Sequence, residues 1–368
     1  MNAFTRRALL GAGIGLAAGH SALRAAYAAD PVVAALEAAL ADAVARDAFV
    51  GVALVLQGDT PLLQTVVGPA DLATGTPNTV DTGFQIASIS KTLTGALMLL
   101  LREEGALALD DPAARWLPDA PNLARDGVDV TIRHLLTHTA GVPDLVGLFE
   151  PRAPQNSPQS PAAMRAMIEA MPLAFTPGER FTYSTSGYVL LGAIVEAITG
   201  ESYEDAARAR ILAPLGMTRT WIAPPADPGP LATGFTKLGP LVAPISQLFD
   251  PRLVGAGGGW TSTIGDLARW HAALRDGTLL APALVAEMTA PAVVVPEPPG
   301  GAYGLGMELQ TIAGEAWWGH KGVTVGFRSA LMHFPELDVA ILILANRLDI
   351  DPDILAADLV TAIGAATS

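Results

Sequence analysis

A serine and a lysine that lie three residues apart, Ser88 and Lys91, are the best candidates in this sequence for nucleophilic chemistry. They stand where a short extended segment meets a helix predicted over 90–104, so both side chains project from one helical face. A serine hydroxyl attacks well only after a neighbouring group removes its proton. The positive end of the helix and burial would both lower the pKa of Lys91, which would let its amine accept that proton. The motif alone also fits a solvated lysine on a capped helix, but the chain has only three lysines against 19 arginines.

Tyr183 is the second candidate, because it precedes an apolar pattern that predicts a helix over 187–198. A tyrosine just before a helix can point its hydroxyl into a cleft, and as a phenolate beside a lysine it could accept the serine proton. The structural alternative is a core tyrosine whose hydroxyl is hydrogen-bonded. Tyr183 therefore takes part in the chemistry only if folding brings it to Ser88 and Lys91.

The third candidate is the run His320-Lys321-Gly322-Val323, in a strand predicted over 317–322. On a strand, His320 and Gly322 share one face while Lys321 points the other way. Gly322 would let a substrate approach the backbone closely. The amide of Val323 could then pair with that of Ser88 to form an oxyanion hole. The alternative is a histidine with a purely structural role.

Together these elements resemble the serine β-lactamase and penicillin-binding protein superfamily, especially its class C β-lactamase-like branch of esterases, D-amino-acid peptidases and β-lactamases. Matching motifs also occur at 109–112 (L-D-D-P), 135–143 (L-L-T-H-T-A-G-V-P) and 261–269 (T-S-T-I-G-D-L-A-R). The resemblance extends over about residues 50–347, with order and spacing preserved. It implies a serine hydrolase with no metal and no organic cofactor.

By this resemblance Ser88 is acylated, Lys91 is the neighbouring base or proton relay, and Tyr183 activates the serine and later water. His320 takes the place of the lysine in the family's K-T-G motif, as in esterase and D,D-peptidase members that carry H-x-G. The chain departs from the family at Thr185, where the Y-x-N pattern usually has an asparagine that binds a substrate amide. Threonine offers a hydroxyl in place of a carbonyl acceptor and an amide donor, which argues against efficient recognition of β-lactams or peptide amides.

Two further motifs bear on the class of enzyme. His134 and His138 have the i,i+4 spacing of zinc ligands, but no glutamate follows the first histidine as in H-E-x-x-H, so we expect no metal site. No G-x-S-x-G elbow occurs, which argues against an α/β-hydrolase. We expect an acyl-enzyme hydrolase of ester or amide carbonyls, nearest to a carboxylesterase. The alternatives are a β-lactamase, a D-alanyl-D-alanine carboxypeptidase or D-aminopeptidase, and a non-catalytic binder of cell-wall peptides.

The order of hydrophobic patterns predicts an α/β (α+β) fold in which the two ends of the chain share one antiparallel sheet, flanked by N- and C-terminal helices. The predicted strands are 50–56, 62–67, 317–322, 327–334 and 339–344, and the predicted flanking helices are 31–46 and 353–363.

This order also divides the chain into domains. Residues 29–87 and 239–368 would form the discontinuous sheet domain, and 88–238 a mostly helical domain inserted into it, with the ligand cleft between the two. The proline-rich segments 151–177 and 223–244 are expected to be long irregular loops.

Residues 1–28 have the features of a twin-arginine export signal. Thr5-Arg6-Arg7 precedes an apolar stretch over 8–18, and Ala26-Tyr27-Ala28 offers small residues at both required positions of a cleavage site. The apolar stretch is shorter than the roughly 20 residues that span a bilayer. We therefore expect a periplasmic or secreted protein with no membrane span after the signal is removed, and a retained anchor is the alternative.

Composition limits the possible partners. The net charge is -14, and after residue 28 the chain carries 19 basic and 36 acidic residues, or -17, which repels nucleic acid and anionic lipid. The absence of cysteine excludes disulfides and thiolate chemistry. With 51% hydrophobic and 16% charged residues the chain is globular. The expected partner is a small-molecule ester, β-lactam or D-amino-acid peptide substrate.

Overall fold

The computed structural model describes residues 30–145, 160–239, 241–296 and 300–367. The predicted export signal, residues 1–28, lies outside the described residues. Among the helices of the described ranges, none is long and apolar enough to cross a membrane.

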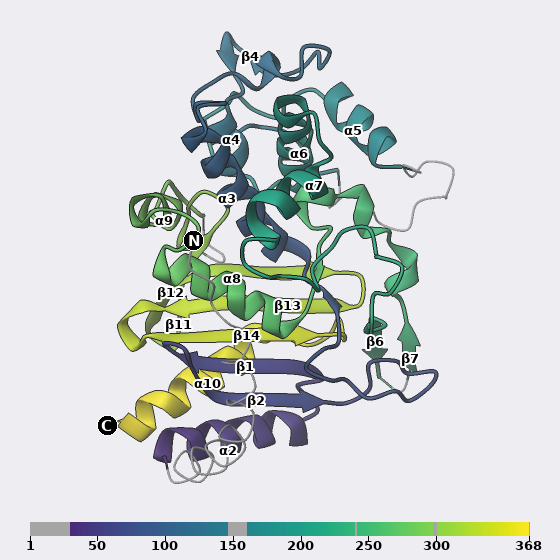
Figure 1. Ribbon diagram of the computed structural model, residues 1–368, viewed down its shortest axis with the longest axis vertical. Helices are drawn as coiled ribbons and strands as arrows, with labels where there is room; N and C mark the ends of the chain where they lie inside the picture. Colours follow the sequence, from purple (N-terminus) through teal and green to yellow (C-terminus); the bar gives the residue numbers. More distant parts are fainter. Residues whose placement is uncertain (1–29, 146–159, 240, 297–299, 368) are drawn as a thin grey trace, which may run out of the picture.

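A sheet of eight antiparallel strands crosses the middle of the molecule (Figure 1), in the spatial order β2-β1-β14-β13-β12-β11-β10-β9. The strands are β1 Gly51–Gln57, β2 Thr60–Val67, β9 Val293–Val294, β10 Ala302–Tyr303, β11 Glu308–Ile312, β12 Glu315–Thr324, β13 Phe327–Phe334 and β14 Val339–Ala345. β1 pairs with β14 from Gly51 opposite Ala345 to Gln57 opposite Val339. The two ends of the chain therefore meet in one sheet, and the predicted fold class is confirmed.

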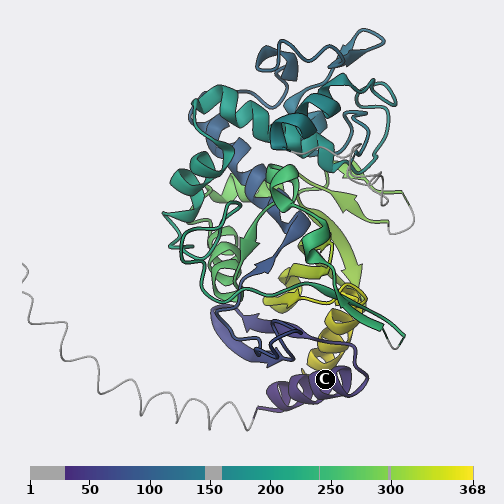
Figure 2. The same cartoon turned by 90° about the vertical axis from the view of Figure 1, so that its right-hand side faces the viewer.

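Strand β14 lies inside the sheet and is buried along its whole length. Its residues alternate between two hydrophobic cores because successive side chains of a strand point to opposite faces. Ile341 and Ile343 belong to the core under α2 Pro31–Ala45 and α10 Pro352–Thr367. Leu342 and Leu344 belong to the core of the opposite face. Figure 2 shows α2 and α10 together on the lower side of the sheet.

The opposite face is covered by the helical part of the chain, which lies between β2 and β9 in sequence (Figure 1). Its helices are α3 Ser90–Glu103, α4 Ile132–Leu136, α5 Pro161–Ala170, α6 Thr185–Thr199, α7 Tyr203–Ala207, α8 Ile264–Asp276 and α9 Pro282–Met288. One continuous hydrophobic core runs from Ile194 of α6 through Leu97 of α3 to Leu342 of the sheet. Helix α3 is therefore held from both sides.

Three short two-stranded sheets complete the helical part. They are β3 Phe84–Gln85 with β8 Thr261–Ser262, β4 Ala124–Arg125 with β5 Val128–Asp129, and β6 Phe235–Leu238 with β7 Leu241–Pro244. Short 3-10 turns also occur, of which η1 Ala87–Ile89 and η8 Gly255–Gly257 matter for the site.

The expectation of irregular structure over 151–177 and 223–244 was wrong for helix α5 and for hairpin β6–β7. Pro161 is compatible with α5 because it occupies the first turn, where a helical N–H has no intrahelical acceptor. Ser160 caps the same helix through a 3.1 Å bond from the Ala163 amide to its Oγ. Pro244 lies at the end of a two-stranded ribbon, a position that proline tolerates.

Two buried histidines join α8 to the sheet. His271 Nε2 lies 3.0 Å from His333 Nδ1, and the Trp318 ring lies 4.6 Å from the His333 ring. Burial lowers the pKa of His271 to about 3 and that of His333 to about 4. Both imidazoles are therefore neutral in the folded protein at pH 7.

We predict that this pair makes stability fall in mild acid. The unfolded chain binds protons near pH 6.5 and the folded pair does not, so stability is complete above pH 6.5 and is lost as the pH falls toward 4. Each histidine contributes a slope of up to roughly 1.4 kcal/mol per pH unit. Urea unfolding between pH 7 and 4.5 measures this slope, and a His271→Gln/His333→Gln variant should show a shallower one. Identical slopes would contradict the assignment.

Candidate active site

Ser88 lies in a tightly held turn between β3 and α3. The Ile86 amide donates to Trp260 O at 2.9 Å, and Ser329 Oγ donates to Ile86 O at 2.8 Å. Ala87, directly before Ser88, has a φ of 46°. A left-handed conformation costs a non-glycine residue of order 1 kcal/mol and persists only where the surrounding structure imposes it. The fold thus keeps the Ser88 turn in one strained geometry.

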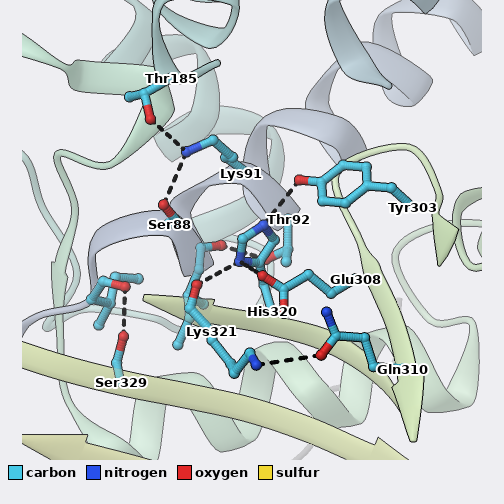
Figure 3. Close-up of polar contacts among 12 residues, drawn as sticks. Ser88, Lys91, Thr92, Thr185, Tyr303, Glu308, Gln310, His320, Lys321 and Ser329 are labelled. Carbon is cyan, nitrogen blue, oxygen red and sulfur yellow. Dashed lines mark hydrogen bonds and ion pairs between the residues drawn. The ribbon is translucent and has the colours of Figure 1, made fainter. Parts of the chain in front are cut away.

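Lys91 is completely buried one helical turn after Ser88. Its Nζ lies 2.6 Å from Gly257 O, 3.0 Å from Ser88 Oγ and 3.3 Å from Thr185 Oγ1. Figure 3 shows the amine between the Ser88 and Thr185 hydroxyls. Burial lowers the pKa of Lys91 to about 7, although the charges of Asp144 and Glu308 act in the opposite direction. A substantial fraction of this lysine is therefore a neutral amine at neutral pH.

The neutral amine has two N–H groups and one lone pair. Gly257 O can only accept a hydrogen bond, so it takes one N–H, and the Thr185 hydroxyl can take the other. The lone pair then faces Ser88 Oγ at 3.0 Å, within hydrogen-bonding distance. This arrangement lets Lys91 remove the serine proton.

Tyr183 adjoins the same pair. Its hydroxyl shares a hydrogen bond with Ser88, and Lys91 Nζ lies 4.8 Å from its ring centroid. The side chain is half-buried and lines the cavity, but burial raises the pKa of the phenol well above its ordinary value. At rest the side chain is a neutral phenol that can donate a proton. This state does not support the phenolate role considered from the sequence.

His134 and His138, the pair with the spacing of zinc ligands, each accept a backbone hydrogen bond in a different part of the structure. His134 Nδ1 accepts a bond from the Thr131 amide and closes the capping box of α4. His138 Nδ1 accepts a bond from the Ser184 amide at 3.0 Å, and its ring lies 4.2 Å from that of Tyr183. His138 therefore packs against the Tyr183 ring and helps to hold it in place. The described ranges hold no cluster of three or more acidic or histidine side chains suited to a metal ion.

Gly322 of β12 is where the sheet meets the Ser88 turn. A Cβ at this position would lie 2.3 Å from Ile86 O and 2.3 Å from Ser329 Oγ. The missing side chain thus makes room for the turn that carries Ser88, a reason that differs from the substrate approach inferred from sequence. Ser88 sits in the first turn of η1, where N–H groups have no intrahelical acceptor, and it borders the cavity together with Val323.

His320 lies behind the cavity wall. Its Nε2 is 2.9 Å from the Tyr303 hydroxyl and its Nδ1 is 2.5 Å from Lys321 O. Burial lowers the pKa of His320 to about 3, so the ring is neutral. Its centroid is 6.2 Å from that of Tyr183, and the side chain is 1% exposed. The structure brings His320 close to the site without exposing it to a ligand, unlike the substrate contact expected from the H-x-G motif.

A cavity of about 420 Å³ opens in front of Ser88. One wall comes from the helical part and the other from the sheet and the start of α10. Its lining residues are Ser88, Asp144, Tyr183, Thr185, Glu308, Lys321, Gly322, Val323, Arg328, Ser329, Asp351, Pro352 and Asp353. Ser88, Tyr183, Thr185, Gly322 and Val323, all candidates from the sequence, therefore share one surface.

Several contributors were not found from the sequence. Asp144 Oδ1 accepts bonds from the amides of Thr185 and Ser186 at 3.1 and 3.4 Å, which fixes the start of α6. Gly257 belongs to the run G-A-G-G-G at 255–259, and this composition was a visible signal of close backbone approach. The acidic residues that the sheet and the start of α10 contribute to the cavity lining could not be recognised from the sequence, because only folding brings them to the cavity.

Comparison with known proteins agrees with this geometry. Esterase EstB of Burkholderia gladioli is 36% identical over 50% of this chain and 50% of its own length. A β-lactamase of Escherichia coli K12 is 29% identical over 76% of this chain and 79% of its own length. The structure of D-amino acid amidase from Ochrobactrum anthropi SV3 matches with a TM-score of 0.78 and 27% identity, covering 92% of this chain and 99% of the amidase.

Coverage of other relatives is partial. The chain spans 38% of penicillin-binding protein 4* of Bacillus subtilis and 63% of protein Rv1367c of Mycobacterium tuberculosis, less than two thirds of each. The Beta-lactamase family model, in contrast, matches residues 36–365, nearly all of the chain. The resemblance inferred from the S-x-x-K, tyrosine and H-x-G motifs is thereby confirmed at the level of the family. The chain belongs to the Beta-lactamase family.

Proposed function

We propose that the protein is an exported serine hydrolase that forms an acyl-enzyme at Ser88 and acts on ester or amide carbonyls with a preference for carboxylic esters. The observation that carries this proposal is the buried Lys91 amine, whose Nζ lies 3.0 Å from Ser88 Oγ and has Gly257 O and the Thr185 hydroxyl as its other hydrogen-bond partners. A structural lysine would have no reason to be buried without a carboxylate partner at its nitrogen.

The proposed acylation starts when Lys91 takes the Ser88 proton and Oγ attacks the substrate carbonyl carbon. Negative charge then develops on the carbonyl oxygen, and the backbone amides of Ser88 and Val323 stabilise it. The bond to the leaving group breaks, and the leaving oxygen or nitrogen takes a proton from the neutral Tyr183 phenol, which Lys91 reprotonates. In deacylation a water molecule gives its proton to Tyr183 as Tyr183 passes its own proton to Lys91, and the water oxygen attacks the acyl carbon. The bond to Ser88 Oγ then breaks, Lys91 returns a proton to Oγ, and the acid leaves.

Support for an ester preference comes from Thr185. A threonine has no carboxamide to pair with a substrate amide, and the Thr185 hydroxyl is already bonded to Lys91. One relative that shares this family is an esterase by name, while others are a β-lactamase and a D-amino acid amidase. Hydrolysis of β-lactams, of D-alanyl-D-alanine peptides or of D-amino-acid peptides is therefore the second candidate.

Export to the periplasm or the medium is part of the proposal and depends on the twin-arginine pattern of residues 1–28. Fractionation of cells that express the full chain, with N-terminal sequencing of the product, would test it. A cytoplasmic product with an intact N-terminus would contradict export.

We predict that the purified protein hydrolyses p-nitrophenyl butyrate with a higher kcat/KM than a chromogenic cephalosporin or D-alanine p-nitroanilide. Ser88→Ala should lower this activity by about 10³-fold or more. Intact-mass spectrometry after exposure to a fluorophosphonate should show one adduct, on Ser88. Preferred turnover of the cephalosporin would overturn the ester preference. Tight ligand binding without any adduct would instead indicate a non-catalytic binder.

Gly322→Ala should uncouple the Ser88 turn from the sheet. The new Cβ would collide with Ile86 O and force a shift of the turn, and displacement of a reacting group by about 1 Å costs roughly 10²-fold in rate. The rate of fluorophosphonate labelling of Ser88 measures the effect. Gly364→Ala on α10, where a Cβ meets no atom within 4 Å, is the matched control and should label at the wild-type rate. Unchanged labelling of Gly322→Ala would refute this role.

A further inference from the structure

The wall of the cavity that comes from the sheet and the start of α10 carries three acidic residues. We call Glu308, Asp351 and Asp353 the acidic wall; all three line the same cavity as Ser88. Lys321, also in the lining, is already bound by Asp353 Oδ2 at 2.7 Å and by Gln310 Oε1 at 3.3 Å. This lysine therefore has little capacity left for a ligand.

Two carboxylate oxygens of the acidic wall lack a donor. Glu308 Oε2 and Asp353 Oδ1 are shielded from solvent and receive no hydrogen bond from the residues that the structure describes. A buried acceptor without a partner costs about 1–3 kcal/mol, and more when it is charged. Two such oxygens in one catalytic cavity point to a ligand that brings its own N–H donors.

Glu308 is close enough to the reaction centre for this ligand to be the substrate, because it lines the same cavity as Ser88 and its charge acts on the Lys91 amine. Its Oε1 lies 3.4 Å from His320 Nδ1, and Figure 3 shows the Glu308 side chain beside His320, above the contact between Lys321 and Gln310. Burial raises the pKa of Glu308 to about 7, and the charge of Lys321 opposes this shift. A cation arriving at the wall would likewise favour the ionised carboxylate.

We propose that the acidic wall binds a protonated amine of the substrate, so that the enzyme prefers esters or amides that carry an ammonium group over neutral or anionic ones. An ammonium has three N–H donors and can give a charge-assisted bond to a carboxylate oxygen that lacks a partner. The inference rests on the proposed serine hydrolase function and adds the charge class of its substrate.

An anionic substrate is the contrary possibility. Counting Asp144, the lining carries four acidic and two basic residues. Of the two bases, Lys321 is paired with Asp353, while Arg328 uses its Nε to hold Leu348 O. Penicillins and peptides with a free C-terminus would bring a carboxylate into this acidic lining with only Arg328 to receive it. The balance of charge favours the ammonium.

The test compares three p-nitrophenyl esters of matched length: 6-aminohexanoate, heptanoate and the pimelate monoester, which are cationic, neutral and anionic. The wild type should hydrolyse the cationic ester with a kcat/KM about tenfold above the neutral one, and the anionic ester should be slowest. Glu308→Gln and Asp353→Asn should bring the cationic-to-neutral ratio toward one, mainly through KM. Because both kcat/KM values of the cationic-to-neutral ratio come from the same variant, a change that slows acylation of both esters equally does not alter the ratio.

Glu336→Gln is the matched control, because it removes the same charge at an exposed position in the turn between β13 and β14. Its ratio should equal that of the wild type. An unchanged ratio in both wall variants, or a preference for the anionic ester, would overturn the ammonium site while leaving the hydrolase intact. Absence of Ser88-dependent turnover of all three esters would overturn the proposed function itself, and the substrate inference with it.

Discussion

The structure depends on one buried contact, that of the Lys91 amine with the Ser88 hydroxyl at 3.0 Å. A lysine without access to water holds its proton weakly, because the charged form loses its hydration. Among the residues that the structure describes, no carboxylate is hydrogen-bonded to the nitrogen; Gly257 O and the Thr185 hydroxyl are its other hydrogen-bond partners. The carboxylates of Asp144 and Glu308 act on Lys91 only through their charge. In the proposed mechanism this amine is the base that takes the Ser88 proton.

The surrounding fold shields this contact from water and fixes its position. Helix α3, which carries Lys91, is packed between the sheet and α6 within one hydrophobic core. The turn at Ala87 is clamped by Trp260 and Ser329, and the missing side chain of Gly322 lets β12 approach it. Tertiary packing can hold such a strained backbone where local preference would not.

Much of this arrangement could be predicted from the sequence, and the reasons for success and failure are physical. Long apolar patterns with clear ends identified α2, α3, α6 and strands β12 to β14, because burial of one face dominates their folding. The prediction of an irregular loop was wrong at α5, because Pro161 is compatible with the first turn of a helix. The inward placement of His320 could not be foreseen, because Tyr303, which binds it, lies on a different strand. The same holds for Glu308, which contacts His320 only across neighbouring strands.

The titration of Lys91 tests the central claim most directly. The chain has three lysines, Lys91, Lys237 and Lys321, so a protein labelled with ¹³C at lysine Cε gives a simple NMR spectrum, in which Lys91 is the resonance lost on Lys91→Arg. We predict that this resonance titrates with a midpoint at about pH 7, as burial requires. A midpoint near 10.4, the ordinary value for lysine, would show that the amine stays protonated at neutral pH and would contradict its role as the base.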